Sequence, residues 1–221
     1  VSDIGADFAI AHDGDGDRCV VVDEKGEVLP LDVQLAIMIE HELANSKNKK
    51  IISTVEASLT IRDVVEKNNG MITITPVGST FVGDMLEERG AGFGGEPCGE
   101  YIYEKGVHVP DAVVAAAKFA EIFCEKGRFS KLRAKYPQHF MAREKFQTSD
   151  RKAAMENVKR AIAIEGEVRS DDGIRIDEED GWLLIRASGT EPIIRLTMEY
   201  KSKEKLEKRK KEMAEIIKKS L

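Results

Sequence analysis

The residues best suited to chemistry lie in one short acidic stretch near the N-terminus. It reads Asp-Gly-Asp-Gly-Asp-Arg and spaces Asp13, Asp15 and Asp17 two residues apart, with Arg18 directly after them. The glycines between the acids permit a tight loop that can turn all three carboxylates inward. Three carboxylates held that close repel one another unless a cation lies between them, and such hard oxygen ligands suit Mg²⁺ or Ca²⁺ better than zinc. The stretch therefore predicts a divalent metal site.

Two other interpretations apply to the same residues. Asp and Gly are common in solvated hairpin turns, and a single Asp-Gly pair would favour such a turn. An EF-hand loop needs glycine at its sixth position, where this sequence has Arg18, and it needs flanking helices rather than short apolar runs. We therefore favour a metal-binding loop between two strands.

A second stretch, near the C-terminus, links two predicted strands. It reads Arg-Ala-Ser-Gly-Thr-Glu-Pro, and another arginine follows on the next strand. Hydroxyls and backbone N–H groups around a glycine can form a concave nest of donors for an anion, and guanidinium groups add charged forks. A plain turn is the alternative, but a turn does not need two hydroxyls between two arginines. The sequence therefore predicts a phosphate site formed by Arg186, Ser188, Gly189, Thr190 and Arg195.

A third stretch, residues 94–100, follows a short apolar run and reads Gly-Gly-Glu-Pro-Cys-Gly-Glu. A carboxylate on a rigid turn, such as that of Glu96, can accept hydrogen bonds from vicinal sugar hydroxyls. Cys98 is as well explained by inert packing as by ligand contact, because no neighbouring cation would activate its thiol. Alone, this stretch is a weak predictor, since glycine-rich loops after strands are common.

Composition predicts an ordinary folded protein. Of the 221 residues, 42% are hydrophobic and 33% are charged, and the net charge of −6 comes from interspersed acids and bases, which argues against nucleic-acid or membrane partners. Three distant cysteines indicate neither a disulfide framework nor a zinc site. No apolar run reaches the roughly 18 residues of a membrane span, and no signal peptide is visible, so we expect a cytoplasmic protein. Because the chain starts at Val1 and in mid-strand, we expect it to be a piece of a longer protein.

Hydrophobic periodicity predicts two domains of different fold class. Strand and helix patterns alternate up to Gly127, which predicts an α/β layered domain with a mostly parallel sheet, and the rest predicts a small α+β domain with clustered strands. The strands expected before Gly127 cover 7–11, 19–23, 51–55, 71–77, a strand from 93, and 101–103, and the helices cover 31–43, 58–68, 80–89 and 112–125. Those expected after it are strands 139–147, 173–177, 182–187 and 193–200 and helices 129–136, 149–163 and 202–220. The first two strands form a hairpin that is marginal alone and needs a sheet which the chain does not supply.

In order and spacing, the three stretches resemble those of the α-D-phosphohexomutase family, which comprises phosphoglucomutases, phosphomannomutases and phosphoglucosamine mutases. In that family a DGDGDR loop carries Mg²⁺, a GE-x-S-G-H loop reads the sugar hydroxyls and an R-x-S-G-T-E-P loop holds the substrate phosphate. The resemblance covers essentially the whole chain and implies three parts. Residues 1–27 would end the family's second domain, 28–127 would form its sugar-binding α/β third domain, and 128–221 its phosphate-binding α+β fourth domain with an antiparallel sheet.

The resemblance also implies a role for each matching position. Arg18 would be a catalytic contact near the reacting phosphate. The implied Mg²⁺ ligands are Asp13, Asp15 and Asp17, and the implied substrate contacts are Gly78, Ser79, Glu96, Cys98, Glu100, Arg186, Ser188, Gly189, Thr190 and Arg195. Cys98 and Glu100 stand where the family usually has Ser and His, so their part in sugar binding departs from the family pattern.

The family's nucleophile has no counterpart here. It is a serine in a T-[AG]-S-H-N-P loop of the first domain, and no Ser-His pair occurs in this sequence. The resemblance implies an isomerase of carbohydrate metabolism that interconverts hexose or hexosamine 1-phosphate and 6-phosphate through a phosphoserine enzyme and a bisphosphosugar. Its partners would be the sugar phosphate, glucosamine phosphate by preference, and the missing N-terminal half of the same protein. The present chain alone would be inactive.

Two other functions are consistent with parts of the sequence. A Mg²⁺-dependent sugar phosphatase of the haloacid-dehalogenase kind also uses closely spaced aspartates, but it needs a nucleophile in D-x-D-x-[TV], and Arg18 follows Asp17 here. A non-catalytic phosphosugar-binding module would also lack a nucleophile. Phosphatase activity abolished by Asp13→Asn would favour the first, and a native transcript encoding only these residues would favour the second.

Overall fold

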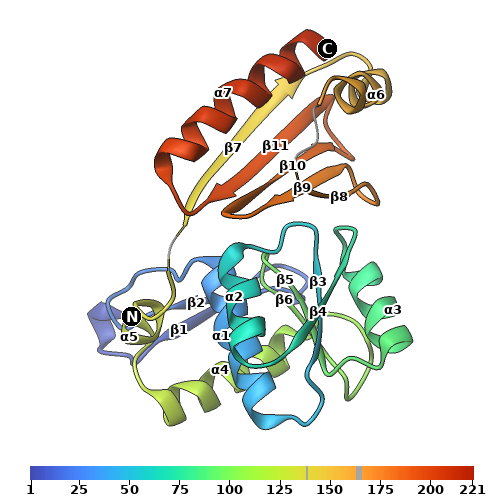
Figure 1. Cartoon of the computed structure of the whole chain (residues 1–221). Coiled ribbons are helices and arrows are strands. Elements are labelled where there is room, and N and C mark those ends of the chain that lie inside the picture. The colour runs from blue at the N-terminus through green and yellow to red at the C-terminus, as the bar shows by residue number, and fades with distance from the viewer. Residues whose placement is uncertain (138, 163–165) are drawn as a thin grey trace. The chain divides into compact units, whose positions relative to one another are not determined.

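The structure is a computed structural model that describes residues 1–137, 139–162 and 166–221 (Figure 1). The chain divides into two compact units, Val1–Gln138 and His139–Leu221, and not near residue 127 as the sequence pattern predicts. The short helix α5 (Phe129–Arg133) explains the later division. Phe129 is fully buried, with its ring centroid 6.0 Å from that of Phe119 and 5.9 Å from that of Phe123. This aromatic cluster ties α5 to the first unit, and a further division at residue 27 stays a prediction.

The first unit is built on a four-stranded sheet of order β4-β3-β5-β6. Its strands are β3 (Lys50–Thr54), β4 (Met71–Thr75), β5 (Phe93–Glu96) and β6 (Glu100–Tyr103). β3 runs parallel to both β4 and β5, and β6 joins β5 antiparallel. A central strand of a sheet covered on both faces buries nearly all its side chains, as β3 does. The predicted α/β layer with a mostly parallel sheet is confirmed.

Helices lie on both faces of this sheet. They are α1 (Leu31–Asn45), α2 (Leu59–Lys67), α3 (Ser79–Arg89) and α4 (Ala112–Lys126). Neighbouring glycines of β5 show which helix faces which side, because successive strand residues point to opposite faces. A Cβ on Gly94 would lie 2.7 Å from Val82 of α3, whereas one on Gly95 would lie 2.6 Å from Leu35 of α1. The two glycines therefore allow both helices to approach β5 closely.

The acidic stretch lies between β1 (Ala9–His12) and β2 (Cys19–Val22), as predicted. These strands form a separate two-stranded antiparallel sheet in which His12 lies opposite Cys19. Gln34 of α1 anchors the hairpin through two hydrogen bonds of its side chain. The side-chain oxygen accepts from the backbone N–H of Val21 at 3.0 Å, and the side-chain NH₂ group donates to the carbonyl of Leu29 at 2.7 Å. The position of the acidic loop is thus fixed to the first unit.

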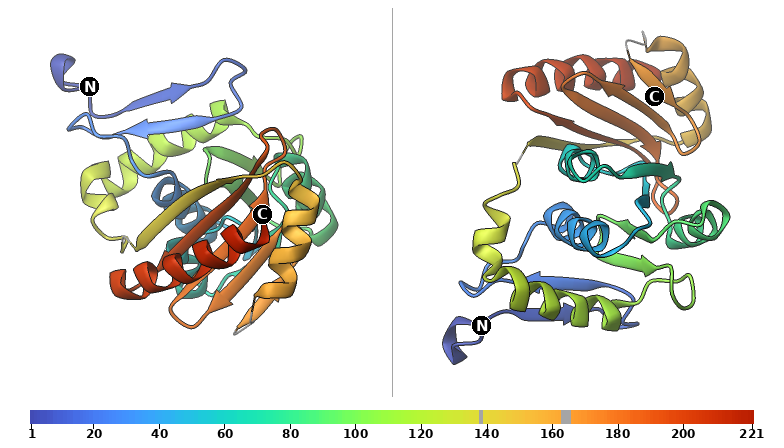
Figure 2. Two further views of the ribbon diagram at one scale, coloured as in Figure 1. Left: turned by 90° about the horizontal axis from the view of Figure 1, so that it is seen from above. Right: turned by 60° about the horizontal axis from the view of Figure 1, so that its bottom comes forward.

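The second unit is a five-stranded antiparallel sheet of order β7-β11-β10-β9-β8, with two helices packed on one face (Figure 2). Its elements are β7 (Phe140–Gln147), α6 (Arg151–Ala161), β8 (Glu167–Arg169), β9 (Ile174–Glu178), β10 (Gly181–Ala187), β11 (Ile193–Tyr200) and α7 (Lys203–Ser220). The expected end of α6 at residue 163 lies outside the described residues. β8 was not predicted, since its three residues carry no apolar alternation.

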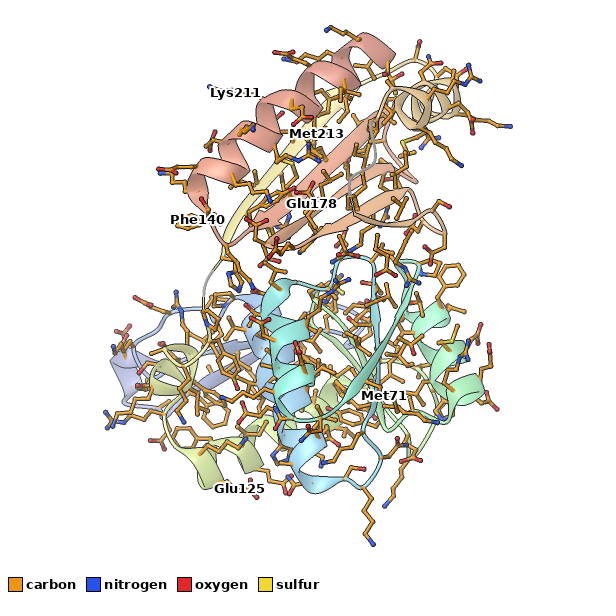
Figure 3. The ribbon with its side chains drawn as sticks, viewed as in Figure 1. Met71, Glu125, Phe140, Glu178, Lys211 and Met213 are labelled. Atoms are coloured by element: carbon orange, nitrogen blue, oxygen red, sulfur yellow. The ribbon has the colours of Figure 1, made fainter. Side chains whose placement is uncertain are left out.

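One hydrophobic core holds this sheet to its helices. Ile194, Leu196 and Met198 of β11 are buried in it together with Leu206, Met213 and Ile217 of α7. Met213 points toward the sheet and Lys211 points away from it (Figure 3). The side of the predicted strand 193–200 that carries Ile194, Leu196 and Met198 is therefore the face that meets the helices. None of the helices in the described residues is long and apolar enough to cross a membrane.

Candidate functional site

The acidic loop brings its three predicted ligands together. Carboxylate oxygens of Asp13, Asp15 and Asp17 all lie within 4.8 Å of one another. Arg18 donates from Nε to Asp13, and the same nitrogen lies 3.6 Å from Oδ1 of Asp17. That Oδ1 is buried and accepts no hydrogen bond from the part of the chain that the structure describes. The guanidinium therefore balances part of the negative charge and leaves an oxygen without a donor.

The pKa values of two acids in this loop shift in opposite directions. Burial raises the pKa of Asp17, and the negative charges of Asp15 and Asp13 raise it further. Burial also opposes ionisation of Asp13, but hydrogen bonds from the side chain and backbone of Arg18 outweigh it and lower the pKa of that carboxyl. A divalent cation would relieve the repulsion that Asp17 experiences. The donor set fits Mg²⁺, since three carboxylate oxygens would fill half of an octahedral shell and leave room for water and phosphate oxygens.

A pair of carboxyl groups lies at the ends of β5 and β6. Glu96 ends β5 and Glu100 begins β6, directly opposite each other in the strand register. Oε2 of the buried Glu96 accepts a hydrogen bond of 3.1 Å from the backbone of Gly78 at the start of α3. The structure thus brings the predicted Gly78–Ser79 loop together with the 94–100 loop. That these residues bind the sugar stays a prediction.

Burial and mutual repulsion change the acidity of this pair. Burial, and next the charge of Glu100, raise the pKa of Glu96 to about 7. Burial, and next the charge of Asp17, raise the pKa of Glu100. Burial raises the pKa of the Cys98 thiol to about 12, so this thiol is un-ionised at neutral pH and inert as a nucleophile. Glu96 is therefore the group in this loop that can exchange a proton near neutrality.

One backbone contact connects the glutamate loop to the acidic loop. The N–H of Cys19, directly after the acidic stretch, donates to the carbonyl of Gly99 at 2.9 Å. Gly99 has a φ of 98°, and a Cβ there would lie 2.9 Å from the carbonyl oxygen of Cys19. Only glycine suits this position, both for its backbone angle and for the close approach. This contact holds the two loops together, and the charge of Asp17 acts on Glu100.

The predicted phosphate loop lies in the second unit, between β10 and β11. Oγ of the buried Ser188 accepts from the N–H of Glu191 at 3.2 Å, and the N–H of Ser188 donates to the carbonyl of Ile193 at 3.0 Å. The Ser188 N–H is therefore used in the turn, while its hydroxyl keeps a hydrogen to donate. Gly189 and Thr190 are exposed at the tip of the loop. The loop is a preformed turn with donors at its tip.

Cationic side chains flank this loop on neighbouring strands. Arg186 of β10 lies opposite Arg195 of β11, which lies opposite Lys145 of β7. Arg186 has Asp172 at 3.5 Å, while Arg195 has Glu191 at 2.8 Å. Like charges directly opposite each other on a sheet are destabilising unless an anion lies between them. The row of cations is consistent with the predicted phosphate site.

Two contacts of this loop were missed by sequence reasoning. Lys145 lies 3.7 Å from the Glu191 carboxylate, and Arg151 of α6 donates to the carbonyls of Ser188 and, at 3.3 Å, of Glu191. Neither residue belongs to the recognised motif. Arg151 is 37 positions from Ser188 and 40 from Glu191, and Lys145 is equally remote in the chain, so only strand register and helix packing reveal these contacts. No local sequence signal identifies them.

Two sequence models match the chain in succession. Phosphoglucomutase/phosphomannomutase, alpha/beta/alpha domain III, matches residues 31–140, and the C-terminal domain of the same family matches residues 141–216. A probable phosphoglucosamine mutase of Methanosarcina acetivorans is 41% identical over 200 residues, covering 90% of this chain and 45% of that protein. One from Pyrococcus furiosus is 33% identical over 226 residues, covering 100% and 50%. The chain spans about half the length of the curated relatives it matches.

Solved structures share the fold over nearly the whole chain. A phosphoglucomutase/phosphomannomutase family protein from Burkholderia thailandensis superposes with a TM-score of 0.86 at 26% identity, covering 97% of this chain and 47% of that one. An Aspergillus fumigatus N-acetylphosphoglucosamine mutase, determined with GlcNAc-6P and magnesium, superposes with a TM-score of 0.71 at 16% identity, covering 95% and 52%. At that identity the second comparison shows the fold alone.

Proposed function

The chain belongs to the phosphoglucomutase/phosphomannomutase family, and we propose that it supplies the metal-, sugar- and phosphate-binding half of a phosphohexomutase. The reaction would interconvert a hexose or hexosamine 1-phosphate and the corresponding 6-phosphate. The observation that carries this proposal is the convergence of three aspartate carboxylates in a loop that is hydrogen-bonded to the loop of the Glu96–Glu100 pair. Such a set suits a metal-assisted transfer of phosphoryl groups on a hydroxyl-rich substrate.

Each loop would have its own task in this reaction. Asp13, Asp15 and Asp17 would hold Mg²⁺, which when bound neutralises charge that develops on the transferring phosphoryl group. Glu96 would orient the sugar through its hydroxyls. The turn between Arg186 and Arg195 would hold the phosphate that is not reacting, by charge-assisted hydrogen bonds.

The phosphoryl carrier would come from outside the chain. A phosphoserine in the N-terminal half of the protein would give its phosphoryl group to the sugar and form a bisphosphosugar. The other phosphate of that intermediate would then return to the serine, which completes the exchange between the two positions. A phosphoryl carrier outside the chain agrees with two observations. The chain spans about half the length of its relatives, and its sequence contains no Ser-His pair.

We propose a hexosamine phosphate as the substrate, with glucosamine phosphate first. Support comes from the names of the relatives, since the proteins from Methanosarcina acetivorans and Pyrococcus furiosus are both described as probable phosphoglucosamine mutases. Glucose and mannose phosphates are the alternatives within the same family.

A substrate comparison tests this proposal. The chain, extended at its N-terminus to the length of its relatives, is assayed with Mg²⁺ and a bisphosphate activator on glucosamine, glucose and mannose 6-phosphates. We expect the highest kcat/KM with glucosamine 6-phosphate and a loss of at least about tenfold in Arg186→Ala, since a charged hydrogen bond to phosphate is removed. Lys208 is an exposed cation on α7, and Lys208→Ala is the control that removes one positive charge elsewhere on the chain; it should leave kcat/KM unchanged. A folded protein that isomerises none of the three sugars would refute the proposal.

A further inference from the structure

The phosphate loop has a lysine beside it that no motif includes. Lys145 lies on β7, opposite Arg195 in the strand register, and its side chain is 63% exposed. Across the next strand, Arg195 lies opposite Arg186, so the three residues form one row over three strands. Of these, Arg186 and Arg195 already have a proposed role in holding phosphate.

An internal carboxylate occupies the space between two of these cations. Oε2 of Glu191 lies 2.8 Å from Nη2 of Arg195 and 3.7 Å from Nζ of Lys145. The hydrogen bond from Arg195, and next the charge of Lys145, lower the pKa of Glu191. The carboxylate is therefore ionised at neutral pH and shared between the two side chains.

The backbone that carries Glu191 is fastened from two sides. Its N–H donates to Ser188 Oγ at 3.2 Å, and its carbonyl accepts from Arg151 at 3.3 Å. The carboxylate can therefore change partner only by rotation of its own side chain, without movement of the turn. Arg195 and Lys145 are both reachable from this one anchor.

A phosphate dianion at the loop tip would compete with Glu191 for Arg195. If Arg195 turned to the phosphate and Glu191 had no second cation, an unpaired carboxylate would face the ligand and repel it. Lys145 removes this difficulty, because it can keep the carboxylate when Arg195 leaves. We propose that Lys145 is a positioning residue of the phosphate site, which retains Glu191 and so frees the Arg195 guanidinium for the phosphate of a sugar phosphate. This inference rests on the proposed role of the 186–195 loop.

A double-mutant cycle distinguishes this role from direct contact. The 221-residue chain is titrated with inorganic phosphate and then with glucosamine 6-phosphate, without Mg²⁺ and at low salt, and Kd is measured by calorimetry. Lys145→Ala should weaken binding about three- to fivefold, the size expected for an exposed charge pair. Glu191→Gln should bind phosphate more tightly than wild type, and adding Lys145→Ala to Glu191→Gln should change Kd by less than about twofold.

Two further measurements exclude a merely structural effect. Lys145→Arg should restore the wild-type Kd, since it restores the cation. The side-chain Nε–Hε NMR signal of Arg195 should shift on phosphate addition in wild type and respond less in Lys145→Ala. Arg143→Ala, an exposed charge two residues away on the same face of β7, is the matched control and should leave Kd within about twofold of wild type.

Other outcomes would overturn the inference. An equal loss from Lys145→Ala in the wild-type and Glu191→Gln backgrounds would assign Lys145 to direct phosphate contact. A loss in Arg143→Ala as large as that in Lys145→Ala would assign the effect to general charge. If Arg186→Ala leaves phosphate binding unchanged, the loop is not the phosphate site, and the proposed function fails together with the inference.

Discussion

Glu96 has a carboxyl group that the fold removes from water and places opposite Glu100. Burial, followed by the charge of Glu100, raises its pKa to about 7. Because this pKa is higher in the folded than in the unfolded chain, the resulting stabilisation is complete below the unfolded value of about 4.3 and is lost as the pH rises through 7. We expect the free energy of unfolding to fall over this window, by at most about 1.4 kcal/mol per pH unit for one proton.

Urea denaturation between pH of about 5 and 8 measures this slope. Glu96→Gln should reduce the dependence of the unfolding free energy on pH. Part of this dependence should remain, because the pKa values of Glu100 and Asp17 are also raised. The exposed Glu88→Gln on α3 is the control and should retain the wild-type slope. An unchanged slope in Glu96→Gln would contradict the assignment.

Asp15 belongs to the acidic loop, whose carboxylates converge within 4.8 Å. Because the predicted metal site has three carboxylates and no phosphoserine oxygen, we expect weak Mg²⁺ binding, with Ca²⁺ as a competitor. Asp15→Asn should weaken Mg²⁺ binding by at least about tenfold, since even outer partners of a metal are worth that much. Isothermal calorimetry compares it with wild type and with the exposed Asp3→Asn. Identical isotherms for wild type and Asp15→Asn would show that this loop is not the metal site.

At the scale of elements, α3 is placed by a glycine in its middle. A Cβ on Gly83 would lie 2.2 Å from the carbonyl oxygen of His108, so the loop before α4 can approach the helix only because the side chain is missing. Gly83→Ala would ordinarily stabilise a helix by about 1 kcal/mol. Here we expect it to destabilise the fold by about 1–3 kcal/mol, because backbone has to move.

Chemical denaturation of Gly83→Ala and of Glu88→Ala, on the exposed side of the same helix, checks this expectation. The control should stay within about 0.5 kcal/mol of wild type. A Gly83→Ala variant more stable than wild type would mean that the loop does not pack against α3 as described.

The sequence predicts most elements, because their local signals agree with their packing. The predicted helix 112–125 is α4, which Asp111 caps by accepting a hydrogen bond from the N–H of Val114, and the predicted strand 193–200 is β11, which places alternate apolar residues in the core. The sequence pattern places the boundary between the units too early. The reason is that the ring of Phe129 packs on aromatic rings of α4, and no local sequence pattern predicts this contact. Within the candidate site, the sequence motifs predict which residues lie together in each loop. The pairing of Glu96 with Gly78 and of Lys145 with Glu191 depends on contacts between distant positions, which spacing does not encode.

At the scale of the whole molecule, the acidic and glutamate loops belong to the first unit and the predicted phosphate loop to the second. The relatives are about twice as long as this chain, which agrees with a phosphoryl carrier outside it. In the described residues the β1–β2 hairpin forms a two-stranded sheet, and such a sheet gains stability from further strands. We therefore expect the N-terminal half of the protein to be needed for turnover, and to restore it when added as a separate chain.

The most direct test is a coupled assay of 1-phosphate to 6-phosphate isomerisation, with Mg²⁺ and a bisphosphate activator. It compares the 221-residue chain, the N-terminal half, their mixture and the full-length protein. We predict turnover by the full-length protein and the mixture, and none by either half, because the metal and binding loops cannot carry a phosphoryl group between sugar oxygens. Asp15→Asn should abolish it in the full-length protein. Robust isomerisation by the 221-residue chain alone would contradict the account, since it would require a nucleophile within these residues.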